Sequence, residues 1–287
     1  MKKIKESRFL SFLTVILVYA VTGLVGIFVY KALSWQFALK LLVADIAATA
    51  VCFVFSLIFS NSSVYDPYWS VQPPFILTAF IIANGISPSA LILLLAVSFW
   101  GVRLTANWAY TFGNLTHQDW RYTMLKETTG KFYPVINFVG IHLVPTLVVY
   151  ACTLPAVYVI MEEPKPNIPF VIFICISVFA TLMQAIADIE MQSFRKEKRQ
   201  GFIRAGLWKY SRHPNYLAEI LMWWGVALSS FSLLPNRPYL LLGAILNTLL
   251  FTFVSIPMAE KRQSRKDGFA LYKSETRVLL PLPKKIK

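Results

Sequence analysis

Long runs of apolar residues recur along the chain, and short polar segments separate them. A helix needs about 20 mostly apolar residues to cross the hydrocarbon core of a bilayer. Only 15% of the 287 residues are charged, against roughly 25% in a soluble domain. The sequence therefore predicts an all-α polytopic helical membrane protein, with about 7–8 transmembrane helices in one bundle. The runs expected to form them are Phe9–Tyr30, Phe37–Phe59, Phe75–Asn84, Ala90–Phe112, Pro134–Ile160, Phe170–Gln192, Tyr216–Leu234 and Tyr239–Met258.

Two of these runs differ from the others. Phe75–Asn84 is short, so we expect it to be tilted, half-buried in protein or joined to its neighbour as a helical hairpin. Phe9–Tyr30 is too long for a signal peptide and lacks a small-residue cleavage site, so it is expected to remain as a helix. Residues 1–34 are thus predicted to add an N-terminal transmembrane helix, preceded by a basic segment, to a membrane domain over residues 35–287.

Lysine and arginine residues gather in alternate connecting segments. The N-terminus, the 111–133 loop, the 193–215 segment and the tail from residue 259 are rich in them, whereas the other loops hold only Lys31, Lys165 and Arg237. Eight spans place all the rich segments on one side, which the positive-inside rule identifies as the cytoplasm. We therefore expect an integral protein of a bacterial inner membrane with both termini cytoplasmic. The net charge of +14 is then a topology signal, so no nucleic-acid partner is expected, and no obligate protein partner is evident.

The cysteines and histidines do not suggest a metal site. Cys52, Cys152 and Cys175 lie inside apolar runs without forming a C-x-x-C pair, and the three histidines are dispersed. We therefore expect neither a disulfide framework nor a bound metal.

Polar residues inside the spans are costly, and they usually face the protein interior. Gln184, Asp188 and Gln192 are spaced by four residues and Arg195 follows three later, so all four share one helix face. This stripe indicates a functional site. The alternative is a polar clamp between helices, with Arg195 extending toward the membrane surface.

A second polar group begins the seventh run. Asn215, Glu219 and Trp223 are four residues apart and share a face, while Arg204, Arg212 and His213 lie at its mouth. Cations beside a helix N-terminus are typical of an anion-binding site. An aromatic interfacial anchor would explain Trp208 and Tyr210, but it would not explain Glu219 one turn deeper.

Two more groups complete the set. In the tail, attraction to anionic lipid explains the last lysines but fits less well with Glu260, Arg262, Arg265 and Tyr272, which lie among apolar residues. In the fourth run one helix face carries Trp100, Arg103, Asn107 and Tyr110, and Asp66 and Trp69 follow the second run. Asp45 and Lys40 are interpreted as structural, with pairing between them as one option.

The sequence holds no nucleophile beside a plausible base and no glycine-rich phosphate loop, which argues against a serine hydrolase, a kinase or a Rossmann dehydrogenase. The polar groups predict instead a cavity with a cationic cytoplasmic mouth and an apolar membrane half. Such a cavity suits a hydrophobic, lipid-like substrate that meets an anionic cytosolic cofactor.

The segment from Gly206-Leu207-Trp208 through Arg212-His213-Pro214-Asn215-Tyr216 to Glu219 resembles the signature of steroid 5-alpha-reductase-like membrane proteins, above all their bacterial branch labelled as a domain of unknown function. The resemblance covers about residues 40–283. It implies a C-terminal cofactor-binding half, at about residues 170–287, and an NADPH-dependent reductase of an activated carbon–carbon double bond in a sterol-like or other lipid substrate. The other matching motifs are Asp66-x-x-Trp69, Trp100-Gly101-x-Arg103-Leu104, Asp119-x-Arg121-Tyr122 and Tyr272 … Thr276 … Leu280-Pro281.

The resemblance also implies roles for individual residues. Arg195, Arg262 or Arg265 would face the 2′-phosphate of NADPH, which favours a bidentate cation, and Asn215 and Glu219 would hold ribose or nicotinamide. The full set of implied cofactor contacts is Asp188, Arg195, Tyr210, Arg212, His213, Asn215, Glu219, Trp223, Arg262, Arg265 and Tyr272.

The residues implied on the substrate side of the site match the family's motifs less well. Asp66 and Tyr110 would form the acid pair that protonates the substrate, and Trp69, Trp100, Arg103 and Asn107 would line it. The stretch that matches the family's Gln-Glu reads Asp66-Pro67-Tyr68 here, which argues against a steroid.

Two alternatives stay open. An S-adenosylmethionine-dependent isoprenylcysteine or phospholipid methyltransferase would share Arg212-His213-Pro214-x-Tyr216, with Glu260 and Arg262. The chain lacks the paired glutamates common in those enzymes, and this alternative gives Asp66 and Asp188 no role. A non-catalytic lipid-binding protein would pair its polar residues structurally and bind no cofactor.

Overall fold

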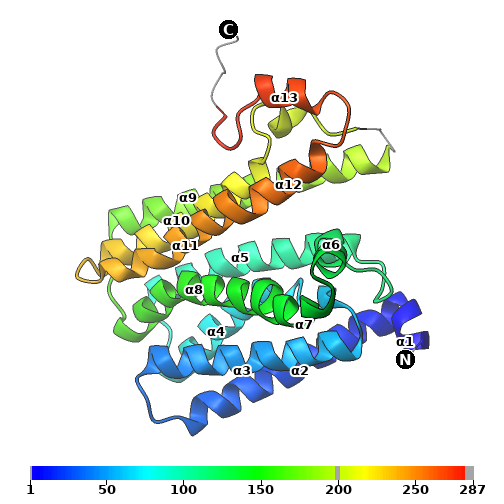
Figure 1. The fold of residues 1–287 in the computed structure, drawn as a ribbon. Coiled ribbons are helices and arrows are strands. Elements are labelled where there is room, and N and C mark those ends of the chain that lie inside the picture. The colour runs from blue at the N-terminus through cyan, green and yellow to red at the C-terminus, as the bar shows by residue number, and fades with distance from the viewer. Residues whose placement is uncertain (1, 198–200, 282–287) are drawn as a thin grey trace. The chain divides into compact units, whose positions relative to one another are not determined.

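The computed structural model describes residues 2–197 and 201–281, and within them the regular structure is helical, apart from one isolated bridge between Ser211 and Arg277 (Figure 1). Seven helical segments among these residues are long and apolar enough to cross a membrane. The prediction of an all-α polytopic membrane protein is therefore confirmed. The helices are α1 (Lys2–Glu6), α2 (Arg8–Ala32), α3 (Phe37–Ile58), α4 (Tyr68–Asn84), α5 (Pro88–Thr111), α6 (Trp120–Thr129), α7 (Tyr133–Ile136), α8 (Val144–Glu162), α9 (Ile168–Lys196), α10 (Pro214–Leu233), α11 (Leu242–Leu250), α12 (Ile256–Gln263) and α13 (Phe269–Glu275).

Two predicted spans differ from the observed helices. The short third run is the second half of α4, which has 17 residues and includes Pro73 and Pro74. The fifth run belongs to a continuous helical segment of 43 residues, Trp120–Glu162, which comprises α6 to α8 and a π-helical segment at Asn137–Leu143. The other six runs match their helices to within a few residues, except that the last helical segment continues from Met258 to Gln263.

Side chains before the spans cap the exposed N–H groups of the first helical turn. The Ser7 hydroxyl accepts from the backbone N–H of Leu10 at the start of α2, and Asn167 accepts from Phe170 at the start of α9. Such caps satisfy backbone donors that have no partner within the helix. They fix the starting residue of each helix more closely than an apolar run does.

Contacts divide the chain into two compact units. Unit 1 consists of Met1–Ile76 and Leu104–Leu154, and unit 2 of Leu77–Arg103 and Pro155–Lys287, so the boundaries fall inside α4, α5 and α8. The sequence-based division at residue 34 and the C-terminal cofactor-binding half stay predictions.

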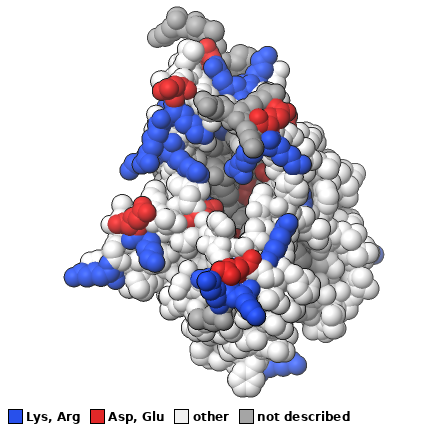
Figure 2. All heavy atoms as spheres, turned by 90° about the vertical axis from the view of Figure 1, so that its right-hand side faces the viewer, with Lys and Arg blue, Asp and Glu red and all other residues white. Residues whose placement is uncertain are grey.

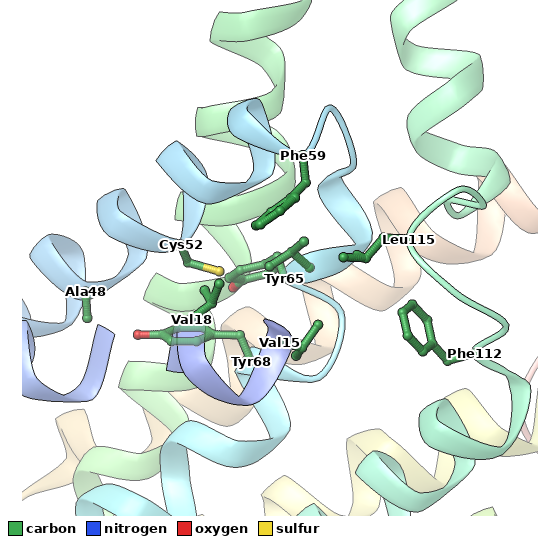
Figure 3. Close-up of a cluster of buried hydrophobic side chains, with 10 residues drawn as sticks. Val15, Val18, Ala48, Cys52, Phe59, Tyr65, Tyr68, Phe112 and Leu115 are labelled. Carbon is green, nitrogen blue, oxygen red and sulfur yellow. The ribbon is translucent and has the colours of Figure 1, made fainter. Parts of the chain in front are cut away.

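Unit 1 is built around α2 and α3, which lie side by side (Figure 1). Its apolar core combines Val15 and Val18 of α2 with Cys52 of α3 and the rings of Tyr65 and Tyr68 (Figure 3). The polar residues of α3 do not follow the pairing considered from sequence. Asp45 accepts hydrogen bonds from Tyr68 and Gln72, while the Lys40 ammonium lies 4.3 Å from the centroid of the Tyr30 ring.

Unit 2 is built around α9 and α10, which pack closely along their length (Figure 1). A Cβ atom at Gly225 would lie 2.8 Å from the Phe173 carbonyl oxygen and from Ser177 Cβ, so only glycine permits this approach. The Ser177 hydroxyl donates to the Met222 carbonyl at 3.0 Å. This contact fixes the register in which the polar faces of the two helices meet.

Candidate functional site

The centre of the candidate site is the buried carboxylate of Glu219 on α10. Its side chain is almost inaccessible, since the residue is only 4% exposed. One oxygen, Oε2, accepts from Trp100 Nε1 at 2.9 Å and from the Gln184 amide, and the other, Oε1, accepts from Trp223 Nε1 at 3.0 Å. Because hydrogen-bonded donors offset the cost of burying a charge, these bonds allow Glu219 to remain inside a span.

A guanidinium extends this network toward the end of α9. Arg103 donates from Nη1 to Asp188 Oδ2 at 2.5 Å and from Nη2 to Gln184 Oε1 at 2.7 Å. Gln184 therefore joins the Arg103–Asp188 ion pair to Glu219. We call the six residues Trp100, Arg103, Gln184, Asp188, Glu219 and Trp223 the Glu219 network.

The network confirms part of the face assignments made from spacing. Gln184 and Asp188 lie on one face of α9, and Glu219 and Trp223 on one face of α10, as their four-residue intervals predict. The prediction gave Asp188, Glu219 and Trp223 to the cofactor and Trp100 and Arg103 to the substrate. The structure brings these two groups into one cluster within unit 2.

One turn before Glu219, the side chain of Asn215 has an unsatisfied acceptor. Asn215 Oδ1 is buried and accepts no hydrogen bond. A buried polar atom without a partner is costly, and it is commonly explained by a bound ligand or water. The Asn215 oxygen thus marks a position where a ligand donor would be favoured, next to the Glu219 network on the same helix.

Cations gather where α9 and α12 end. Arg195 and Arg262 are exposed, and both lie close enough to Lys266 to affect its ionisation. Burial, reinforced by the charges of Arg262 and Arg195, lowers the pKa of the Lys266 ammonium. We call Arg195, Arg262 and Lys266 the cation cluster. Clustered cations of this kind attract phosphate groups.

Three predicted cofactor residues instead hold the C-terminal segment in place. Arg212 is buried and donates from Nε to Glu260 at 2.6 Å and from Nη1 to the Thr276 carbonyl. His213 Nε2 lies 3.5 Å from the same Glu260 carboxylate. The Tyr272 hydroxyl donates to the Trp208 carbonyl, and burial raises the pKa of this phenol to about 12. These contacts hold α13 against the segment before α10. A direct contact of these three residues with a cofactor stays a prediction.

The two remaining predicted cofactor residues are at the surface. Tyr210 is 58% exposed, and Arg265 is exposed in the loop after α12. Lys and Arg side chains stand out on the face drawn in Figure 2, with acidic side chains beside several of them. This distribution does not test on which side of the membrane the termini lie, so their cytoplasmic orientation stays a prediction.

The predicted acid pair and two substrate residues belong to unit 1. Asp66 accepts a hydrogen bond from the Tyr122 hydroxyl, whereas Tyr110 is half-exposed on α5. Burial raises the pKa of the Asp66 carboxyl to about 6, although the nearby Arg121 guanidinium opposes this shift. Trp69 packs against the core cluster of unit 1, and Asn107 is half-buried on α5.

A comparison with protein-family models identifies the family of this chain. The model described as "Protein of unknown function (DUF1295)" matches residues 52–276. The chain belongs to the DUF1295 family. The match includes every residue of the Glu219 network. An uncharacterized protein of the fission yeast Schizosaccharomyces pombe is 24% identical over 217 residues, which are 64% of this chain and 63% of the yeast protein, so the chain spans less than two thirds of that relative. No solved structure matches the chain significantly.

Three residues of this DUF1295 chain have roles that the predicted site residues did not include. Gln184 bridges Arg103 and Glu219, Tyr122 binds Asp66, and Glu260 binds Arg212. The four-residue spacing to Asp188 was a usable signal for Gln184. The partners of Asp66 and Arg212 are 56 and 48 residues away in the sequence, so local spacing could not reveal them.

Proposed function

We propose that the chain is an NADPH-dependent membrane reductase of an activated carbon–carbon double bond in a sterol-like or other lipid substrate. The observation that carries the proposal is the Glu219 network, a set of polar side chains hydrogen bonded to one another within membrane helices, beside the unsatisfied oxygen of Asn215. The resemblance of residues 206–219 to steroid 5-alpha-reductase-like proteins supports it. We further propose a bacterial inner membrane, with both termini cytoplasmic.

The residues present fit a phosphorylated nicotinamide cofactor. Asn215 Oδ1 is an acceptor without a donor, and both the nicotinamide amide and the ribose hydroxyls offer donors. The cation cluster at the ends of α9 and α12 provides the charge that a diphosphate and a 2′-phosphate require. NADH lacks the 2′-phosphate, so the cluster is proposed to favour NADPH.

NADPH, when bound, supplies the hydride. The protein's own part is to orient and to exclude water. Asn215 and Glu219 would hold the nicotinamide ribose region, and the buried indoles of Trp100 and Trp223 keep water from the Glu219 carboxylate. Arg103 fixes the Gln184 amide, so that its N–H₂ group points at Glu219.

Reduction of a double bond conjugated to a carbonyl also requires a proton donor. We propose Asp66 and Tyr110 for this role. The pKa of Asp66, raised by burial to about 6, places the carboxyl nearer to neutral pH than an ordinary aspartate, which suits general acid catalysis. Tyr122, which donates to Asp66, holds the carboxyl in position.

The proposal is tested by thermal unfolding of purified protein in detergent with NADPH, NADH or S-adenosylmethionine. A ligand that binds only the folded state adds about 2.7 kcal/mol at one hundred times its dissociation constant. We expect strong stabilisation by NADPH and weaker stabilisation by NADH. Asn215→Ala should reduce it, whereas the control Asn84→Ala, which removes an amide bonded to its own helix at Phe80, should not.

Two outcomes would favour the alternatives. Stabilisation by S-adenosylmethionine alone would indicate a methyltransferase, for which Arg212 and Glu260 form the shared core. No stabilisation by any of the three ligands would indicate a non-catalytic lipid-binding protein.

A further inference from the structure

Unit 1 contains a buried acid that the proposed function does not use. Asp45 lies near the middle of the span Phe37–Ile58 and is 5% exposed. Its carboxyl oxygens accept from the Tyr68 hydroxyl at 3.3 Å and from the Gln72 amide. Among the described residues, no lysine, arginine or histidine pairs with it. An ionisable group inside a membrane without an opposite charge is costly, and it commonly serves proton or ion transfer.

A continuous chain of hydroxyl groups starts at this acid. The Tyr68 hydroxyl is also hydrogen bonded to Thr49. Thr49 Oγ1 lies 3.0 Å from Thr146 Oγ1, which in turn lies 2.8 Å from the Tyr65 hydroxyl. All four side chains are buried. A hydroxyl can donate one hydrogen bond and accept one or two, so each of these groups can take up one proton and release another.

A buried base packs against the ring of Tyr65, the last residue of this chain. His142 belongs to the π-helical segment Asn137–Leu143, four residues before Thr146, and its ring centroid is 4.6 Å from that of Tyr65. Its Nδ1 donates to the Asn137 carbonyl at 3.0 Å when the imidazole is neutral, which leaves Nε2 as an acceptor. His142 Nε2 is buried without a hydrogen-bond partner. π-Helical turns occur frequently at functional sites.

The acid end can accommodate both protonation states. Gln72 donates its amide to ionised Asp45, and its Oε1 is buried without a partner. If the amide turned by half a rotation, its oxygen would accept from a protonated Asp45. The donor and acceptor ends of a glutamine amide are interchangeable in this way.

We propose that unit 1 holds an internal proton path, in which Asp45 binds a proton and the hydroxyls of Tyr68, Thr49, Thr146 and Tyr65 carry it to and from His142. In the forward direction the O–H bond of Asp45 breaks and each hydroxyl accepts one proton while it releases its own. An N–H bond then forms at His142 Nε2. A carboxylic acid and a neutral imidazole become a carboxylate and an imidazolium, so the atoms and the charge balance. The other titratable groups that face this path are Tyr19, Cys52 and Asp66.

Infrared spectroscopy of the whole protein in nanodiscs tests the path without a substrate or cofactor. Aspartate labelled with ¹³C identifies the carbonyl band of protonated Asp45, and transfer to D₂O reports how fast its proton exchanges. Asp45→Asn should remove the band. Asp45→Glu, which keeps the acid, should move the band to the glutamate region and serves if the asparagine variant does not fold.

Breaking the chain of hydroxyls should slow the exchange. Thr146→Val replaces the central hydroxyl by a methyl group of similar shape, so we expect exchange at Asp45 to slow by about tenfold or more. Thr153→Val is the matched control, since Thr153 lies on the same helix and donates only to its own backbone at Val149. Wild-type exchange rates in both Thr146→Val and Thr49→Val, or a labelled band that Asp45→Asn leaves unchanged, would overturn the proposal.

Discussion

Glu219 in unit 2 and Asp45 in unit 1 are both carboxylates inside membrane helices, and their neighbours give them different properties. Glu219 accepts from two indoles and an amide, and an indole N–H can only donate. Asp45 accepts from an amide and from a phenol that continues into a chain of hydroxyls. The same buried group is therefore surrounded by donors that can only donate in one unit and connected to the proposed proton path in the other.

The two units also differ in whether a cation lies near the buried carboxylate. In unit 2 the side chain of Gln184 bridges the Arg103–Asp188 ion pair and the Glu219 carboxylate. In the described part of unit 1, the acid Asp45 has only neutral partners. A fixed, charged site suits the binding of an anionic cofactor, whereas neutral partners that can reverse their hydrogen bonds suit proton exchange.

The largest expected effect comes from removing the fixed cation. The side chains of Arg103 and Asp188 are only 11% and 16% exposed, so Arg103→Met leaves a buried charge without its partner and should cost about 3–5 kcal/mol of unfolding free energy. Adding Asp188→Asn should recover part of that loss. Reversible unfolding in mixed micelles measures both. The control is Arg204→Met, whose pair with Glu275 is about 40% exposed on each side and should contribute less than about 1 kcal/mol.

The helix contacts of the two units should respond differently to one added methyl group. Gly225→Ala in unit 2 brings a Cβ within 2.8 Å of the Phe173 carbonyl oxygen, and we expect it to destabilise by about 1–3 kcal/mol. Gly26→Ala in unit 1 meets Ala48 Cβ at 3.6 Å, an ordinary contact. It should therefore be neutral or slightly stabilising. Equal midpoints of thermal unfolding for the two variants would contradict this difference in packing.

Amide replacements separate the two carboxylates most directly. In Glu219→Gln one oxygen becomes an N–H₂ group that faces the N–H of Trp100 or Trp223, which leaves buried donors unsatisfied and should cost about 1–3 kcal/mol. In Asp45→Asn, Tyr68 and Gln72 can reverse their hydrogen bonds, so the loss should stay below about 1 kcal/mol. The same unfolding assay compares them. A larger loss for Asp45→Asn than for Glu219→Gln would break the distinction.

The last expected effect is a pH dependence that arises in unit 1. The pKa of Asp66 is about 6 in the folded chain against an ordinary value of 3.8, so the folded state holds the proton more tightly. The contribution of this group to stability is therefore present below about pH 4 and lost as the pH rises toward 6. Asp66→Asn should flatten this part of the stability profile. An unchanged slope would show that Asp66 is not the titrating group.

The sequence predicted the helices and the faces of the site because both depend on local periodicity. The intervals between Gln184 and Asp188, and between Glu219 and Trp223, placed these side chains on the correct faces. The sequence could not predict that Trp100 binds Glu219, 119 residues away, or that Arg212 binds Glu260. Those contacts depend on how separate helices pack. Asp45 illustrates the same limit, because nothing near it in sequence identifies Tyr68 and Gln72 as its partners.

Binding of a phosphorylated nicotinamide by the Glu219 network and the cation cluster is the central property proposed for this chain. Calorimetric titration of NADPH and NADH into the purified protein, and into Asn215→Ala and Arg195→Ala, measures this directly. We expect tighter binding of NADPH than of NADH in the wild type, a loss for both ligands in Asn215→Ala, and a loss mainly for NADPH in Arg195→Ala. A wild-type protein that binds neither nucleotide, or binds both equally well with and without Arg195 and Asn215, would contradict the account.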